Sequence, residues 1–272
     1  MDFPTRLFGI IGYPLGHSIS PALHNWAFAN VDYPGVYLAW PIAETDLADF
    51  FTAVRTLQIM GGNITIPHKV AAMGFMDEVS GRAGKTGAIN TFYWRDGKLC
   101  GENTDIAGFV APLSGRSFSH ALVLGSGGAA RAILAGLHEL GIPRITVANR
   151  TWQKAIDLAS DFDAQAIAWE ERLDVAADLI VNATALGMKG ERVDMTPYPE
   201  KGFAHRKGLA YDIVYNPPET RFLREAKEHG WQTLNGLPMF VEQARAAFRL
   251  WTGREMPYRA ALQKVRGWLK DG

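Results

Sequence analysis

The chain alternates short apolar runs with longer segments of helical periodicity, and it does so in two successive series. In the first series, apolar runs at 6–12, 36–42 and 59–66 are separated by segments 21–30 and 47–57. Apolar residues in the last segment recur at spacings of three and four, which is typical of a helix with one buried face. A strand–helix–strand–helix–strand order favours a mainly parallel sheet covered by helices.

The second series begins after residue 120 and repeats the pattern. It predicts strands at 121–124, 144–148, 178–182 and 209–213, with helices at 129–140 and 151–162 between the first of them. This order is typical of a doubly wound nucleotide-binding (Rossmann-type) domain. Two closing helices, 238–252 and 258–269, are expected to pack back on the first domain. We therefore expect an α/β protein of two α/β domains, the first formed by 1–104 and 238–272 and the second by 105–237.

Composition excludes several classes of protein. The 272 residues carry 28 Lys plus Arg and 28 Asp plus Glu, so the net charge is zero and gives no electrostatic reason to expect nucleic acid or a membrane surface as partner. A single cysteine, Cys100, permits neither an intrachain disulfide nor a cysteine metal cluster. Residues 7–31 lack charged side chains, but Pro14, Pro21 and several polar groups would be unfavourable in lipid. We expect a cytoplasmic monomer or homodimer without a leader peptide or metal.

A glycine-rich turn lies between the first strand and first helix of the second series. Residues 125–130 read G-S-G-G-A-A, the G-x-G-x-x-A form of the dinucleotide fingerprint. Gly125 permits the tight turn, Gly127 lets the backbone approach a pyrophosphate, and the helix N-terminus offers N–H groups to the phosphates. The turn predicts a dinucleotide site formed by Gly125, Ser126, Gly127, Gly128 and Ala129.

The residues after the second strand of this series indicate which dinucleotide is bound. An NAD-preferring fold usually places Asp or Glu there, to hold the ribose 2′-hydroxyl. This chain instead has Asn149, Arg150 and Thr151, with Lys154 one turn later. A guanidinium can bind a 2′-phosphate through two hydrogen bonds, and Lys154 adds a second positive charge. The alternative is a solvated basic helix start, but cations there oppose the helix dipole. The sequence favours NADP.

Further polar clusters follow apolar strands in the first series, and together with the glycine turn they resemble a known family. The segments are GYPLGHSISP (12–21), NITIPHK (63–69), GAINT (87–91), GENTD (101–105), GSGGAA (125–130), NRT (149–151), NATALGM (182–188) and YDIVYNPPET (211–220). In this order they resemble the shikimate dehydrogenase family, including its quinate/shikimate members, over nearly the whole chain. The resemblance implies reversible, metal-free reduction of 3-dehydroshikimate to shikimate with NADPH, a step in the biosynthesis of chorismate and the aromatic amino acids.

The resemblance also implies roles for individual residues. Lys69 matches the catalytic lysine, with Asp105 as its partner. Ser18 and Ser20 match the pair that binds the substrate carboxylate, assisted by Tyr215. The residues that match those holding the ring hydroxyls of the substrate are Thr65, Asn90, Asp105 and Gln243. In addition to the glycine turn and the basic residues described above, the matches to cofactor-binding residues are Thr184, Ile213 and Gly236.

Each assignment has a structural alternative. Ser20 and Asp105 are also placed as helix N-caps, and His17 and His68 are interpreted as structural and not as general acids. Two other functions remain open. One is a quinate/shikimate dehydrogenase with relaxed substrate or cofactor use. Ser20 favours shikimate over quinate as substrate, because quinate-preferring members of the family tend to carry Thr at this position. The other is a non-catalytic NADP-binding regulator, which is expected to have lost Lys69 or Asp105.

Overall fold

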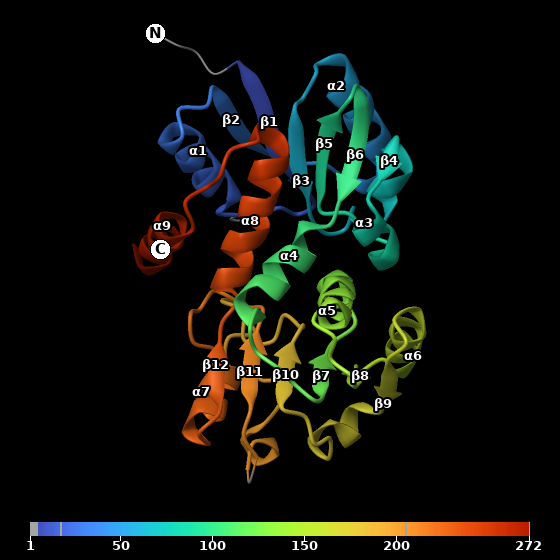
Figure 1. Cartoon of the computed structure of the whole chain (residues 1–272), viewed down its shortest axis with the longest axis vertical. Helices are drawn as coiled ribbons and strands as arrows, with labels where there is room; N and C mark the ends of the chain where they lie inside the picture. The colour runs from blue at the N-terminus through green and yellow to red at the C-terminus, as the bar shows by residue number, and fades with distance from the viewer. Residues whose placement is uncertain (1–4, 17, 205, 272) are drawn as a thin grey trace. The chain divides into compact units, whose positions relative to one another are not determined.

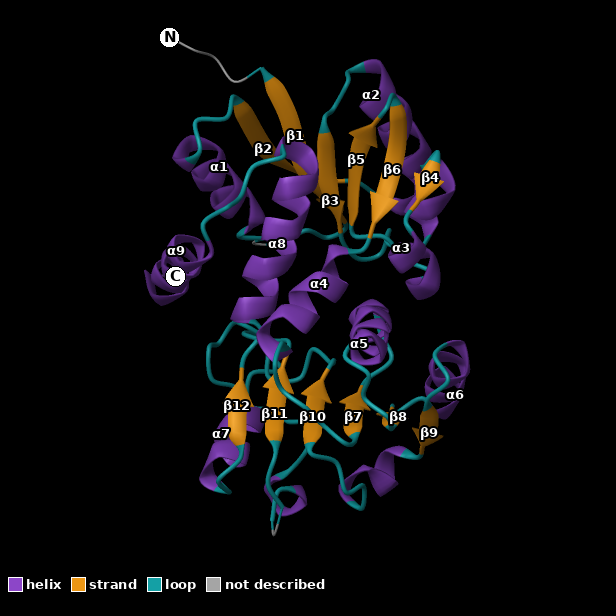
Figure 2. Ribbon diagram, in the orientation of Figure 1, coloured by secondary structure: helices purple, strands orange, loops and turns teal. Residues whose placement is uncertain are grey.

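The computed structural model describes residues 5–16, 18–204 and 206–271, and the chain forms two compact units. The first unit is Met1–Gly108 with Val241–Gly272, and the second is Phe109–Phe240. The chain enters the second unit within helix α4 (Thr104–Val110) and returns within helix α8 (Leu237–Thr252). Within the described residues each unit contains one six-stranded sheet (Figures 1 and 2). The predicted α/β class is confirmed.

The sheet of the first unit is mainly parallel. Its strands lie in the order β2-β1-β3-β5-β6-β4, and β1 pairs in parallel with both β2 and β3. Strand β5 alone runs against its neighbours β3 and β6. The bounds are β1 (Arg6–Gly12), β2 (Gly35–Pro41), β3 (Gly61–Ile64), β4 (Glu78–Val79), β5 (Thr91–Arg95) and β6 (Lys98–Glu102).

Helices cover both faces of this sheet, because side chains of successive strand residues point to opposite faces. On one face the ring of Phe8 packs 5.4 Å from Trp251 of α8 and 5.0 Å from Phe28 of α1 (Ser20–Asn30). Helix α9 (Tyr258–Asp271) contacts α1, so α9 and the part of α8 from Val241 onward belong to this unit. On the other face Ile11 joins the core formed by α2 (Leu47–Thr56). The short helices of this unit are η1 (Glu44–Asp46), η2 (Ala71–Phe75) and α3 (Gly81–Thr86).

The second unit is a doubly wound sheet whose strands are all parallel, in the order β12-β11-β10-β7-β8-β9. The strand order reverses between β7 and β10, the point beyond which such sheets bind ligands. The strands are β7 (Ala121–Leu124), β8 (Ile145–Ala148), β9 (Gln165–Ile167), β10 (Leu179–Asn182), β11 (Leu209–Asp212) and β12 (Gln232–Leu234). The helices are η3 (Ala111–Leu113), α5 (Gly128–Glu139), α6 (Trp152–Asp161), η4 (Trp169–Leu173), η5 (Glu200–Gly202) and α7 (Arg221–Glu228).

Two predicted helix caps were wrong. Ser20 is the first residue of α1, because the N–H of Leu23 donates to the carbonyl of Ile19, and Ile19 is therefore the N-cap. Asp105 lies in the first turn of α4, and its own N–H donates to Oδ1 of Asn103 at 3.2 Å. The third predicted strand, 59–66, is shorter than expected: β3 comprises Gly61–Ile64, and only single backbone hydrogen bonds continue at Met60, Thr65 and Ile66.

Candidate active site

Three predicted site residues are in direct contact in the first unit. The ammonium Nζ of Lys69 donates to Oδ2 of Asp105 at 2.5 Å, and the amide Nδ2 of Asn90 donates to Oδ1 of the same carboxylate at 2.8 Å. The lysine and aspartate side chains are 17% and 14% exposed, so solvent or a ligand reaches both. The two carboxylate oxygens thus have separate partners, one charged and one neutral.

The local backbone explains why these residues meet. Lys69 lies in the turn that follows β3, and its carbonyl accepts from the N–H of Ile89, next to Asn90. Asn90 precedes β5, which pairs antiparallel with β3. Asp105 lies in the first turn of α4, which begins two residues after the end of β6, the strand hydrogen-bonded to β5. Three neighbouring strands, β3, β5 and β6, therefore place the three residues at the same end of the strands.

The arrangement is suited to stabilising negative charge on a ligand oxygen. An ammonium group has three N–H donors, and one of them is used by Asp105. A half-buried cation held by a carboxylate offers its other donors to a polarised carbonyl and provides a transferable proton.

The other predicted substrate residues occupy separate places. Ser18 lies before α1, where its Oγ accepts the N–H of Ser20 at 3.3 Å. Thr65 directly follows β3 and is half-buried, and Gln243 is a half-buried residue of α8. Among the described residues, no hydrogen bond joins the side chains of Ser18, Ser20 or Thr65 to Lys69, Asp105 or Asn90.

Tyr215 belongs to the second unit, unlike the other predicted substrate residues. Its ring packs 4.9 Å from that of Phe240, and burial raises the pKa of its hydroxyl.

The glycine turn follows β7 at the switch point of the second sheet. Gly125 has φ +110°, and a Cβ there would lie 2.9 Å from Cγ2 of Thr184. Gly127 is the N-cap of α5, with no atom within 4 Å of the position that a Cβ would take. The first N–H groups of any helix lack partners within it, so this turn presents donors beside open space.

The predicted basic residues lie at the start of α6. Arg150, Thr151 and Lys154 are exposed, and the first turn of α6 contains no acidic residue. Asn149 is half-buried, and its Nδ2 donates to the carbonyl of Thr151. The positive charges of Arg150 and Lys154 therefore lie at the positive end of the helix dipole, an unfavourable arrangement that a bound phosphate would offset.

The loops after β10 and β11 are joined by a buried carboxyl. Asp212 accepts from Nδ2 of Asn182, the N–H of Val214 and the hydroxyl of Thr220. Burial raises the pKa of Asp212 to about 7 despite these three donors. Asn182 in turn accepts from the N–H and the hydroxyl of Thr184.

The two remaining predicted cofactor residues, Ile213 and Gly236, lie against each other. Gly236 is buried so closely beside Ile213 that a Cβ would lie 1.9 Å from its carbonyl oxygen. Five of the parallel strands, β7, β8, β10, β11 and β12, are thus followed by predicted cofactor residues.

Two histidines, His17 and His68, were interpreted from the sequence as structural. His68 is buried, and its Nε2 lies 2.7 Å from the carbonyl oxygen of Ile42, which it tethers to the turn before Lys69. This contact agrees with a structural role. His17 lies outside the described residues.

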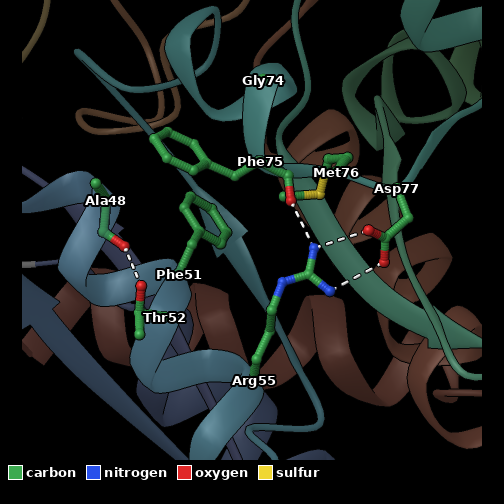
Figure 3. Close-up of a pocket in the computed structure, with 8 residues that line it drawn as sticks. All are labelled: Ala48, Phe51, Thr52, Arg55, Gly74, Phe75, Met76 and Asp77. Atoms are coloured by element: carbon green, nitrogen blue, oxygen red, sulfur yellow. Dashed lines mark hydrogen bonds and ion pairs between the residues drawn. The ribbon is translucent and has the colours of Figure 1, made fainter.

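A surface pocket of about 340 Å³ lies elsewhere in the first unit, between α2 and residues 74–77 (Figure 3). Its guanidinium, Arg55, donates to both carboxylate oxygens of Asp77 and to the carbonyl of Phe75 (Figure 3). The pocket's one cation is therefore already paired.

The described part of the chain contains no group of three or more His, Cys, Asp or Glu side chains placed to hold a metal ion. It also contains no helix with the length and apolar character required to span a membrane.

Sequence reasoning did not assign a role to three buried polar residues around Asn90. Thr91, Thr104 and Asn63 are each 6% exposed or less, and both threonine hydroxyls lie within 3.1 Å of Oδ1 of Asn90. The available signal was the presence of polar side chains at the ends of otherwise apolar strands.

Comparison with known proteins identifies the family. Three family models match: the shikimate dehydrogenase substrate binding domain at 10–92, shikimate / quinate 5-dehydrogenase at 113–189, and the shikimate 5′-dehydrogenase C-terminal domain at 236–266. A shikimate dehydrogenase (NADP(+)) of Oleidesulfovibrio alaskensis is 48% identical, over 99% of this chain and 98% of the relative. The chain belongs to the shikimate dehydrogenase family. The resemblance inferred from the motifs is confirmed.

Solved structures show the range of this family. A shikimate 5-dehydrogenase from Thermus thermophilus, in complex with NADP(H) and shikimate, is 39% identical and has a TM-score of 0.88, covering 96% of this chain and 99% of that one. A quinate dehydrogenase from Corynebacterium glutamicum, in complex with NAD, is 30% identical with a TM-score of 0.90 and covers 96% and 99%. The fold is therefore common to members with different substrates and cofactors, and the residues of the site must distinguish them.

Proposed function

We propose that this chain is an NADP-dependent shikimate dehydrogenase that reversibly reduces 3-dehydroshikimate to shikimate. The observation that carries the proposal is the contact between Lys69 and Asp105 at 2.5 Å, beside Asn90, in a member of this family. Replacing a buried ion pair by apolar residues often leaves the free energy of unfolding unchanged. The half-buried pair is therefore not required for stability, and its presence at a ligand-accessible position favours an enzyme over a non-catalytic regulator.

The lysine performs the proton chemistry in this proposal. NADPH, when bound, supplies the hydride. As the ketone carbon is reduced, negative charge develops on its oxygen, and the Lys69 ammonium stabilises that charge and delivers a proton. Asp105 orients the ammonium through Oδ2, and its position also allows it to hold an adjacent ring hydroxyl. In the reverse direction Lys69 receives the hydroxyl proton.

The first unit carries nearly all of the proposed substrate contacts. Ser18 and Ser20 bind the carboxylate with Tyr215, while Thr65, Asn90 and Gln243 bind the ring hydroxyls. Neutral hydroxyl donors satisfy a carboxylate without the tight grip of an arginine, which suits an enzyme that must release its product. We assign residues 1–104 and 238–272 to this substrate-binding domain and 105–237 to the cofactor domain.

The residues of the second unit fit NADP. The open space at Gly127 and the N–H groups at the start of α5 suit a pyrophosphate. Exposed Arg150 and Lys154, with no acid in the first turn of α6, suit a 2′-phosphate better than a free 2′-hydroxyl. Thr184, Ile213 and Gly236 complete the proposed cofactor residues. We place this activity in the cytoplasm, in aromatic amino acid biosynthesis, in a monomer or homodimer.

The test follows reduction of NADP and NAD at fixed enzyme concentration with shikimate and with quinate in parallel. We expect the highest kcat/KM with shikimate and NADP. A higher kcat/KM with quinate, or with NAD, would assign the chain to the quinate/shikimate group with relaxed use. No reduction of either cofactor with either acid would favour the regulator.

A further inference from the structure

We propose that Thr91 is a positioning residue for the Lys69–Asp105 pair, acting through the side chain of Asn90 and held in turn by Asn63. The proposal rests on the proposed function, because it assigns catalysis to that pair. Thr91 is fully buried and Asn63 is 6% exposed, so neither touches a ligand. Any effect on catalysis must therefore pass through the residues that they contact.

The orientation of the Asn63 amide is determined by its surroundings. Asn63 on β3 is the register partner of Thr91 on β5, and its Nδ2 lies 3.3 Å from the main-chain carbonyl oxygen of Asn90. A main-chain carbonyl only accepts, so the Asn63 atom facing it must be the NH₂ group. The other end, Oδ1, then accepts the hydroxyl of Tyr37 at 2.6 Å.

This orientation leaves the Thr91 hydroxyl free to donate only on the side away from Asn63, where Oδ1 of Asn90 lies at 3.0 Å and Oγ1 of Thr104 at 3.2 Å. Nδ2 of Asn63 also donates to Oγ1 of Thr91 at 3.1 Å, so Thr91 accepts on that side. Its single proton is then available for Oδ1 of Asn90, at 3.0 Å. The N–H and the hydroxyl of Thr104 donate to the same oxygen, at 2.7 and 3.1 Å. Three donors thus converge on one end of the Asn90 amide.

The other end of that amide holds the catalytic carboxylate. With Oδ1 of Asn90 surrounded by donors, Nδ2 points to Oδ1 of Asp105 and leaves Oδ2 for Lys69. A rotated amide would set its oxygen against a carboxylate oxygen and its NH₂ against other donors, and unpaired buried polar groups are strongly unfavourable. Asn63, Thr91 and Asn90 have no titratable side chain, so their own charge does not change with pH.

The test is Thr91→Val, which removes the hydroxyl and keeps the branched shape, with Thr91→Ser as the conservative variant. Loss of one hydrogen bond from the chain is expected to lower kcat about tenfold, the equivalent of roughly 1.4 kcal/mol. Thr91→Ser is expected to restore kcat to within about threefold of wild type. The matched control is Thr146→Val on β8, which removes another buried hydroxyl, bonded to His120 at 2.8 Å, and is expected to leave kcat unchanged.

A double-variant comparison separates positioning from general destabilisation. In an Asn90→Ala background, Thr91→Val should change kcat less than about twofold, because the route to Asp105 is already broken. An undiminished kcat in Thr91→Val, or a loss of equal size in both backgrounds, would overturn the proposal. If Thr91→Val does not fold, Asn63→Ala removes the donor behind the same hydroxyl and is judged by the same comparison. Full activity in Lys69→Ala would instead contradict the proposed function.

Discussion

Lys69 keeps its ammonium in a half-buried position because a carboxylate lies directly beside it. The side-chain amide of Asn90 donates a hydrogen bond to the other carboxylate oxygen of Asp105. The Lys69–Asp105 pair therefore has a defined geometry without a ligand. Half-burial strengthens the interaction of such a pair with a polarised carbonyl, because less water screens it. At the scale of single residues, the catalytic proposal therefore depends on one nitrogen and one carboxylate.

Replacing Lys69 by Ala is expected to lower kcat by about 10²- to 10⁴-fold, the usual effect of removing a positioned acid–base group. KM for shikimate should change little by comparison, because the proposed carboxylate and hydroxyl contacts remain. Steady-state oxidation of shikimate measures both constants. The Arg131→Ala variant, which breaks the exposed ion pair with Asp161 in the second unit, is the charge-matched control and should retain wild-type kcat. Near wild-type turnover in Lys69→Ala would refute the assignment.

At the scale of elements, we expect the start of α6 to determine the preference for NADP over NAD. Arg150→Ala combined with Lys154→Ala should raise KM for NADP and leave KM for NAD nearly unchanged, since NAD lacks the 2′-phosphate. Each lost charge-assisted contact corresponds to about 1.5–3 kcal/mol when well formed, or roughly one to two powers of ten in affinity. Parallel titrations with both cofactors give the comparison. A similar rise in both KM values would show that these side chains do not read the phosphate.

Four of the strands that could be predicted from the sequence bury whole apolar runs. Strands β7, β8, β10 and β11 are buried at every position, so their composition alone marks them. The three-residue strands β9 and β12 begin with a glutamine and contain no buried residue, and they were not predicted. The β5–β6 hairpin was also missed, although Asp96-Gly97, with φ values of +52° and +75°, is a typical hairpin turn.

The candidate site was predictable only in part, for a related reason. Motifs similar to those of the family pointed to Lys69 and Asp105, which are 36 residues apart. Nothing in the sequence indicates that Asn63 and Thr91 become register partners, because that pairing depends on β5 entering the sheet antiparallel beside β3. Contacts that depend on the register of a sheet are part of the tertiary structure, and local sequence patterns do not predict them.

At the scale of the whole molecule, one buried histidine makes the first unit sensitive to acid. His24 stacks on Tyr37 at 4.6 Å and lies 5.0 Å from Trp251, and among the described residues neither ring nitrogen has a hydrogen-bond partner. Burial lowers the pKa of His24 from 6.5 to about 3. Between these values the unfolded chain binds a proton that the folded chain excludes, so stability falls as the pH drops below 6.5.

From pH 7.5 to pH 5, this histidine should lower the free energy of unfolding by roughly 2 kcal/mol, since each unit of separation corresponds to about 1.36 kcal/mol. His24→Phe removes the titration and should reduce the difference between the two pH values by that amount. Urea unfolding of both proteins at both pH values isolates the effect from any change in packing. An equal pH difference in the two proteins would show that His24 does not carry it.

Division into two units predicts that each ligand protects its own part of the chain from hydrogen exchange. Under the proposed assignment, NADP alone should slow exchange around 121–130 and 145–154, and shikimate alone around 61–70 and 88–105. A ligand at 100 times its Kd stabilises its binding state by about 2.7 kcal/mol, which slows amides that exchange through opening of that unit by up to roughly 100-fold. Mass spectrometry of peptides from both units, with each ligand separately, measures the pattern. Protection by NADP alone that is confined to residues 5–108 would contradict the assignment of the cofactor to the second unit, since the glycine turn and the basic start of α6 both lie within Phe109–Phe240.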